Sequence, residues 1–283
     1  MRQGLRIGLV IPALDEAASI GLVVRSVPPW VDRVVVADNG SSDQTAEVAA
    51  AAGAQVVREP RRGYGSACLA GAEAVRDCDV VVFADADGSD DLAEMNRVVA
   101  PILTGHAALV IGSRVRGRAE KGALTPQQRF GNALACLLIR LRWRVRFTDL
   151  GPFRAVTRQA LDRLAMADPD YGWTVEMQVK AAQSSMAVVE VPVSYRRRIG
   201  RSKISGTVRG VLAAGAKILW VIARSAAQPS RSALAPGASR FQKNSVLSTR
   251  LSAALLDFFA ELPGAQVVLG PLKRGAPPGR RSA

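Results

Sequence analysis

Four aspartates follow a single apolar run in this chain of 283 residues. The stretch "VVVFADADGSDD", residues 80–91, sets Asp85, Asp87, Asp90 and Asp91 directly after residues that are typical of a buried strand. Carboxylates that alternate by two at a strand end, as Asp85 and Asp87 do, can approach one divalent cation. Asp90 and Asp91 favour a different interpretation, in which their side chains cap the helix that follows.

Polar groups also end three other apolar runs. These groups are residues 12–16 at the end of "LRIGLVIPA", residues 38–43 at the end of "VDRVVVAD" and residues 112–114 at the end of "AALVIGSR". Short Val/Ile-rich runs alternate with Ala-rich helical segments, which predicts βαβ units and a mostly parallel sheet. Ligands bind such a sheet at the carboxyl ends of its strands. We therefore predict an α/β fold in which these loops build one site.

Further elements are expected after residue 120. Residues 125–146 favour a helix with a proline at its start and an arginine-rich end, "TDLGPFRAV" a turn with a short extended piece, and "DPDYGWTVEMQVKAAQ" another helix. The segment "AVVEVPVSYRRR" favours a late strand. We divide the chain into a main domain (1–207), an amphipathic helix (208–225) and a basic, partly disordered tail (226–283).

The charge of the chain is uneven. Its formal net charge is +14, but residues 1–194 have 22 basic and 22 acidic side chains, whereas residues 195–283 have 16 and 2. With 48% hydrophobic residues, the chain can bury a substantial core. Three cysteines without metal-ligand spacing predict buried thiols in a reducing cytosol. The basic start reaches Asp15 and Glu16 without a cleavage site, so we expect no signal peptide.

Several stretches together resemble one enzyme family. "IPALDEAASI", "VADNGSSDQT", "RRGYGSACLAGAEA" and "ADADGSDD" are similar, in this order, to the loops of family 2 glycosyltransferases, which have the GT-A fold. "TDLGPFRAV", "YGWTVEMQ" and "VPVSYRRRIGRSKIS" are most similar to the polyprenyl-phosphate branch, the dolichol-phosphate mannosyltransferase-like enzymes. The resemblance covers residues 5–222. It implies an inverting hexosyltransferase that uses a nucleotide-diphosphate sugar of the UDP-glucose or GDP-mannose type.

The resemblance assigns the first loops to this donor. It implies Mg²⁺ or Mn²⁺ to neutralise the leaving diphosphate, with Asp87 as the direct ligand and Asp85 facing the ribose or a metal-bound water. Asp38 is expected to recognise the base. From the residues alone, Asp38 also fits an Asx turn, Asp15 a helix cap and Gly63 a plain turn. The donor-binding residues that the resemblance implies are Pro12, Ala13, Asp15, Glu16, Asp38, Gly63, Asp85 and Ala86.

Cations dominate the residues expected at the acceptor. A lipid phosphate is already an anion, so it needs cations and no general base. We expect "RRRIGRSKIS" to act as a flexible lid, with a solvated basic loop as the alternative. The cations assigned to catalysis are Arg114 and Arg154, and those assigned to phosphate binding are Arg129, Arg198, Arg201 and Lys203.

Glu176, in "YGWTVEMQ", is the candidate catalytic carboxylate near the anomeric centre, together with Asp87 on the donor side. By resemblance, relatives that use hydroxyl acceptors have an acidic pair in this region. Here Met177 follows Glu176, which favours a phosphate acceptor over a hydroxyl.

The sequence predicts contact with a membrane surface without a spanning helix. "VLAAGAKILWVIA" contains Lys217 and is shorter than the roughly 20 apolar residues that a spanning helix needs. Arg140, Arg142, Arg144 and Arg146 alternate with Leu, Trp and Val, which favours attraction to anionic lipids. We predict peripheral binding at the cytoplasmic face of the cell membrane, where an integral membrane protein could be a partner.

Three alternatives remain at this point. The net charge fits a nucleic-acid-binding protein, but the basic excess lies in the last third of the chain, away from the acidic loops, so we expect no nucleic acid partner. A sugar-1-phosphate nucleotidyltransferase needs a first loop with glycine and lysine. The loop "PALDEAAS" contains neither, so the sequence does not favour this class of enzyme. A family 2 glycosyltransferase with a soluble hydroxyl or phosphorylated acceptor is the third.

Overall fold

The computed structural model describes residues 1–200 and 208–227. Within these ranges, seven strands form one sheet in the order β3-β2-β1-β4-β6-β5-β7. Its strands are β1 Ile7–Ala13, β2 Arg33–Asp38, β3 Gln55–Arg58, β4 Val80–Phe83, β5 Leu109–Ala119, β6 Arg154–Thr157 and β7 Val188–Tyr195. The helices are α1 Ala17–Arg25, α2 Thr45–Ala51, α3 Tyr64–Ala74, α4 Met95–Leu103, α5 Pro126–Trp143, α6 Arg158–Leu164, α7 Trp173–Gln183 and α8 Val208–Ala227, with a short 3₁₀ turn at Leu92–Glu94.

The predicted α/β fold with a mostly parallel sheet is confirmed. Strands β3, β2, β1 and β4 are parallel neighbours, and β5 pairs in parallel with β7. Strand β6 runs antiparallel between β4 and β5. The carboxyl ends of β1, β2 and β4 therefore lie at one edge of the sheet, where the first three acidic loops meet.

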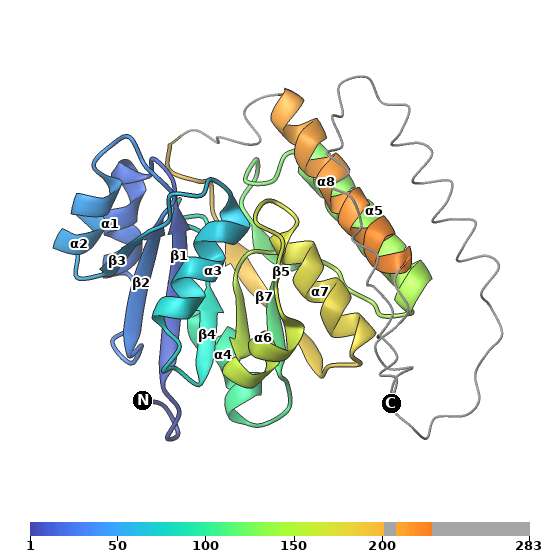
Figure 1. Cartoon of the computed structure of the whole chain (residues 1–283), viewed down its shortest axis with the longest axis horizontal. Helices are drawn as coiled ribbons and strands as arrows, with labels where there is room; N and C mark the ends of the chain where they lie inside the picture. Colours follow the sequence, from blue (N-terminus) through green and yellow to red (C-terminus); the bar gives the residue numbers. More distant parts are fainter. Residues whose placement is uncertain (201–207, 228–283) are drawn as a thin grey trace, which may run out of the picture.

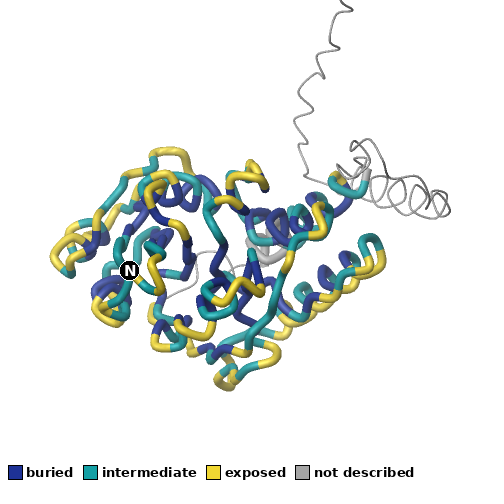
Figure 2. The backbone as a smooth tube through the Cα atoms, turned by 90° about the horizontal axis from the view of Figure 1, so that it is seen from below, coloured by how far each residue is buried: buried dark blue, intermediate teal, exposed yellow. Residues whose placement is uncertain are grey.

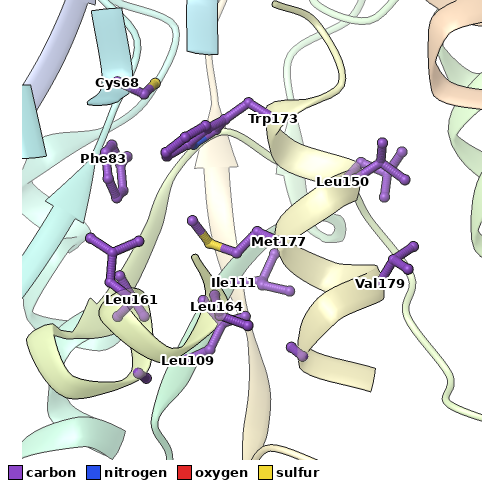
Figure 3. Close-up of a cluster of buried hydrophobic side chains, with 14 of the residues drawn as sticks. Cys68, Phe83, Leu109, Ile111, Leu150, Leu161, Leu164, Trp173, Met177 and Val179 are labelled. Atoms are coloured by element: carbon purple, nitrogen blue, oxygen red, sulfur yellow. The ribbon is translucent and has the colours of Figure 1, made fainter. Parts of the chain in front are cut away.

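Helices cover both faces of the sheet (Figure 1), and an apolar core lies between the sheet and the helices on each face. Helices α1, α2 and α4 cover one face, where Ile11, Ile20 and Val98 are buried. Helices α3, α6 and α7 cover the other. There Trp173 of α7 packs edge-on against Phe83 of β4, with ring centroids 5.8 Å apart (Figure 3). Strands β1 and β4 are fully buried, edge strand β3 has no buried residue, and exposed residues gather on the outside of the molecule (Figure 2).

Helices α5 and α8 lie side by side beyond the edge of the sheet (Figure 1). The predicted helix at 125–146 begins with a capping box, in which Thr125 and Gln128 each accept a backbone N–H from the other, and Pro126 occupies the first turn. It ends at Trp143 because Arg144 adopts a left-handed conformation with φ of 60°. Helix α8 covers the segment predicted to be helical, and Arg142 of α5 donates to the carbonyl of Ala226 at 3.0 Å.

The predictions on cysteines, on a membrane-spanning helix and on the end of the chain are compared with the structure in turn. Cys68, Cys78 and Cys136 are buried free thiols, as expected. No helix in the described ranges has the length and apolar content needed to cross a membrane. Arg201, Lys203 and the tail from residue 228 lie outside the described residues, so the lid, the tail and the three-part division of the chain stay predictions.

Candidate active site

A cavity of about 390 Å³ lies where strands β1, β2 and β4 end. It contains acids from the loops after β1, β4 and α6, an amide from the β2 loop, and arginines from the loop after β3 and the segment after β7. It is lined by Pro12, Ala13, Leu14, Glu16, Asn39, Arg62, Gly63, Tyr64, Ala67, Asp85, Ala86, Asp87, Asp170, Tyr171 and Arg198. We call it the donor cavity below.

Asp85 is half-buried in the donor cavity, and the hydroxyl of Tyr64 donates to its Oδ1 at 3.2 Å. Burial raises the pKa of Asp85 well above its usual value, and the nearby charges of Asp90 and Asp87 raise it further. A divalent cation would relieve this repulsion. No group of three or more His, Cys, Asp or Glu side chains in the described ranges could hold a metal alone. The acids therefore fit a cation such as Mg²⁺ that takes one or two carboxylates and completes its ligands with substrate phosphates.

Asp87 is buried, with 7% of its surface exposed. Its Oδ1 accepts the backbone N–H and the hydroxyl of Ser89, at 2.9 and 2.5 Å. Its Oδ2 lies 3.4 Å from a guanidinium nitrogen of Arg198, which also donates to Glu16 at 2.8 Å. The hydrogen bonds to Oδ1 thus orient the Asp87 side chain, while Oδ2 faces the guanidinium of Arg198.

The expected capping role is correct for Asp91 and wrong for Asp90. Asp91 accepts the backbone N–H of Ala93 at 3.3 Å and caps the 3₁₀ turn. Asp90 instead points back into the loop, where its Oδ2 accepts the backbone N–H of Asp85 at 3.0 Å. Burial raises the pKa of Asp90 to about 7. The Asp90 side chain is buried inside the 85–91 loop and stabilises the conformation of that loop.

Most of the expected donor residues come together in the donor cavity. Six of them line it: Pro12, Ala13, Glu16, Gly63, Asp85 and Ala86. Asp38 and Asp15 do not. Asp38 is buried and accepts the backbone N–H of Ser41 at 3.2 Å. This contact agrees with the alternative in which Asp38 stabilises a turn. Asp15 accepts the backbone N–H and the hydroxyl of Ser42, at 2.6 and 3.0 Å. Their donor roles stay predictions that the contacts do not favour.

Sequence reasoning missed several lining residues, among them Asn39, Tyr64 and Asp170. Asn39 accepts the N–H of Gly63 at 2.7 Å, which joins the β2 loop to the start of α3. A Cβ on Gly63 would lie 2.2 Å from the carbonyl oxygen of Pro169, so that residues 168–171 approach α3 through the gap that the glycine leaves. The glycines on both sides of Tyr64 were the available signal, but glycine alone does not reveal which distant segment will approach.

A second cavity of about 390 Å³, called the basic cavity below, lies between the end of β5 and the start of α5. It is lined by Arg114, Val115, Gly117, Ala119, Leu124, Gln128, Arg129, Asn132, Ala133, Thr148 and Asp149. Arg114 donates to both oxygens of the fully buried Asp149, at 2.9 and 2.7 Å, and its guanidinium lies 4.9 Å from the centre of the Tyr195 ring. Asp149 thus holds Arg114 in place, and Arg129 is exposed beside it.

Arg154 and Glu176 line neither the donor cavity nor the basic cavity. Arg154 is buried and donates to the backbone carbonyls of Gly151 and Thr174, and burial lowers its pKa to about 10. Glu176 accepts the backbone N–H groups of Ala167 and Asp168 and pairs with Lys180 at 2.8 Å. The structure does not bring either residue to Asp87, because each is used to anchor backbone. Their expected catalytic roles remain predictions without geometric support.

Comparison with known proteins agrees with this fold. The model of glycosyl transferase family 2 matches residues 9–164. The chain is 40% identical over 213 residues to an uncharacterized glycosyltransferase of Mycobacterium tuberculosis, covering 75% of this chain and 95% of that one. It is 30% identical over 222 residues to the undecaprenyl-phosphate mannosyltransferase of Micrococcus luteus, covering 73% and 90%.

A solved structure is also similar. It is glucosyl-3-phosphoglycerate synthase from Mycobacterium tuberculosis, in complex with Mn²⁺, uridine diphosphate and glucosyl-3-phosphoglycerate. The TM-score is 0.64 and the identity 25%, over 81% of this chain and 82% of that chain. The same enzyme has been crystallised with Mg²⁺ and uridine diphosphate. These complexes support the expectation of Mg²⁺ or Mn²⁺ as cofactor.

The fold and the family match define a GT-A glycosyltransferase. The chain belongs to glycosyl transferase family 2 and is a hexosyltransferase.

Proposed function

We propose that this enzyme transfers a hexose, with inversion, from a nucleotide-diphosphate sugar to a polyprenyl phosphate at the cytoplasmic face of the membrane. The observation behind this proposal is an acidic donor cavity with a basic cavity nearby. Arg114 of the basic cavity is close enough to Asp85 and Asp90 to lower the pKa of both carboxyls, although burial and neighbouring acids outweigh it. Donor and acceptor could thus meet near Arg114.

On the donor side, Asp87 and Asp85 would hold Mg²⁺ or Mn²⁺ together with the donor phosphates. Bound there, the cation would supply positive charge to the leaving diphosphate. Asn39 and Arg62 are in position to contact the nucleotide because both line the donor cavity. UDP-glucose and GDP-mannose are the two donor types that the proposal includes.

On the acceptor side, the residues favour a phosphate over a hydroxyl. A hydroxyl needs a general base, whereas a phosphate needs cations. Among the residues that the structure describes, Asp149 is the one carboxylate that lines the basic cavity, and both of its oxygens accept from Arg114. Arg129 remains exposed there to pair with an anion. A phosphate acceptor therefore matches this lining better than a hydroxyl.

The outer face of α5 supports a membrane surface as a partner. Phe130, Leu137 and Leu141 are 70%, 48% and 62% exposed, and their spacing of seven and four residues sets them on one helix face. Arg140 and Arg144 are exposed next to them. An apolar stripe beside arginines fits a helix that lies in the interface of an anionic bilayer. An integral membrane protein is the other partner that this face could meet.

A soluble phosphorylated acceptor is the second candidate. The similar glucosyl-3-phosphoglycerate synthase, which was crystallised with phosphoglyceric acid, motivates it. Such an acceptor would use the same arginines and would need no membrane.

The decisive test is a transfer assay with UDP-glucose and GDP-mannose, with Mg²⁺ or Mn²⁺. Acceptors would be a short polyprenyl phosphate, 3-phosphoglycerate and unphosphorylated sugars. We expect a labelled lipid product that is lost with EDTA and reduced about tenfold or more by Arg129→Ala. Transfer to 3-phosphoglycerate alone would refute the lipid acceptor, and transfer to a sugar hydroxyl alone would refute a phosphate acceptor.

A further inference from the structure

The segment after β7 lies across the 85–91 loop. The backbone N–H of Arg196 donates to the backbone carbonyl of Ser89, and that of Ile199 donates to the backbone carbonyl of Asp87, both at 2.8 Å. The Arg196 side chain pairs with Asp91 at 2.7 Å. Tyr195 also forms an isolated bridge with Asp90. Residues 195–199 are thus fixed to the loop that provides the candidate metal ligands.

This attachment sets Arg198 between two acids of the donor cavity. Its guanidinium lies 2.8 Å from Glu16 and 3.4 Å from Asp87, whose side chains are 11% and 10% exposed. The Arg198 side chain is 30% exposed, and its Nε is buried without a hydrogen-bond partner among the described residues. Because Ser89 occupies the Oδ1 of Asp87, the guanidinium faces the oxygen that a metal ion would use.

We infer that Arg198 competes with the divalent cation for Asp87 and so couples metal binding to nucleotide binding. This inference rests on the proposed metal site. A guanidinium and a divalent cation repel each other at this distance, and partial burial weakens the screening by water. Without nucleotide, the metal must displace Arg198. With nucleotide, the diphosphate offers anionic oxygens to both cations, so the repulsion becomes shared attraction.

Coupling of this kind is reciprocal. The factor by which nucleotide tightens metal binding must equal the factor by which metal tightens nucleotide binding. Removing the guanidinium therefore has two effects: the metal binds more tightly without nucleotide, and the coupling factor becomes smaller. A residue that only binds phosphate would weaken nucleotide binding and leave nucleotide-free metal binding unchanged.

The experiment measures Mn²⁺ affinity by calorimetry or by electron paramagnetic resonance, on the full chain, with no nucleotide, with UDP and with GDP. The variants are Arg198→Ala, Arg198→Lys and Asp87→Asn. The matched control is Arg197→Ala, which removes the same charge one residue away, where the side chain donates to the Lys121 carbonyl instead. We expect Arg198→Ala to raise nucleotide-free Mn²⁺ affinity about three- to tenfold and to reduce the coupling factor similarly. Arg198→Lys should lie between this variant and the wild type, and Arg197→Ala should behave like the wild type.

The other outcomes separate the inference from the proposed function. If the wild type binds Mn²⁺ with nucleotide but Arg198→Ala has unchanged or weaker nucleotide-free affinity, the competition is refuted and the metal site stands. If the wild type binds no Mn²⁺ with UDP or GDP, or if Asp87→Asn binds it equally well, the proposed metal site is wrong, and the competition falls with it.

Discussion

Three aspartates of the 85–91 loop look alike in the sequence and differ in the structure. Asp87 directs one oxygen toward the guanidinium of Arg198. Asp85 accepts from the Tyr64 hydroxyl, and Asp90 accepts the backbone N–H of Asp85. Their difference comes from the partners that each meets, since all three follow the same strand. Substitutions at the three positions should therefore give different results.

Asp87→Asn keeps the shape of the side chain and removes its charge. We expect turnover with saturating donor and metal to fall about 10²-fold or more, because the cation's neutralisation of the leaving diphosphate amounts to several kcal/mol. Asp77→Asn is the control, since Asp77 is an exposed partner of Arg6 and Arg33 far from the cavity. Steady-state kinetics checks this, and wild-type turnover in Asp87→Asn would refute the metal assignment.

Asp90 predicts a specific dependence of stability on pH. A carboxyl with a pKa raised from 3.8 to about 7 binds its proton more tightly in the folded chain than in the unfolded chain. The free energy of unfolding should therefore fall as the pH rises from about 4 to about 7, and this contribution should be constant above that. Asp90→Asn has no such proton. In EDTA, the melting temperature of Asp90→Asn minus that of the wild type should therefore become larger between pH 5 and pH 8. A difference that stays constant over this range would contradict the raised pKa.

At the scale of elements, residues 167–172 connect α8 and α7 to the donor cavity. Asp168 accepts the N–H groups of Asp170 and Gly172, at 2.9 and 3.2 Å, and pairs with Lys217 of α8 at 3.1 Å. Asp170 and Tyr171 line the donor cavity. The wall of the cavity therefore depends on how this loop packs against the start of α3.

Gly65→Ala tests this packing. The added Cβ would lie 2.0 Å from the carbonyl oxygen of Asp168, so α3 or the loop must move. We expect a lower melting temperature and weaker UDP or GDP binding. Gly131→Ala is the matched control in α5, because its Cβ would meet nothing within 4 Å. That change should stabilise the chain by about 0.5–1 kcal/mol through helix propensity. Thermal unfolding and nucleotide titration of both variants measure these effects, and unchanged nucleotide binding in Gly65→Ala would show that the loop does not shape the cavity.

The apolar face of α5 predicts lipid binding. Leu137→Glu with Leu141→Glu should reduce sedimentation with anionic vesicles about tenfold or more, because each leucine loses about 1.5–3 kcal/mol of apolar burial. The control is Leu22→Glu on α1, since Leu22 is 55% exposed and α1 lies at the opposite side of the molecule (Figure 1). Equal loss in the control would mean that general charge, not this face, governs binding.

At the scale of the whole molecule, ligand binding should appear as stability. A nucleotide at about 100 times its dissociation constant stabilises the folded chain by about 2.7 kcal/mol. For a domain of this size, that corresponds to roughly 5–10 °C in melting temperature. We expect this shift with Mn²⁺ and UDP or GDP together, and its loss on adding EDTA. A shift of equal size with nucleotide in EDTA would show that the metal does not take part in donor binding.

Much of the fold and the donor loops could be predicted from the sequence. Strand and helix periods are local, so Val/Ile-rich runs and their polar ends indicated a mostly parallel sheet with a site at one edge. The position of β6 between β4 and β5 was not predictable in the same way. It depends on pairing between Phe83 and Arg154, which lie far apart in the chain.

The sequence by itself determined the family, the α/β fold and the loops that provide the acids, because residue types and local periods are sufficient for these. Only the tertiary structure decided which charged side chain does what. Asp91 caps and Asp90 does not, Glu176 anchors a loop, and Arg198 meets Asp87 across more than a hundred residues of chain. The reason is physical: a charged group takes its role from the partners and the burial that the fold gives it, and those partners are distant in sequence.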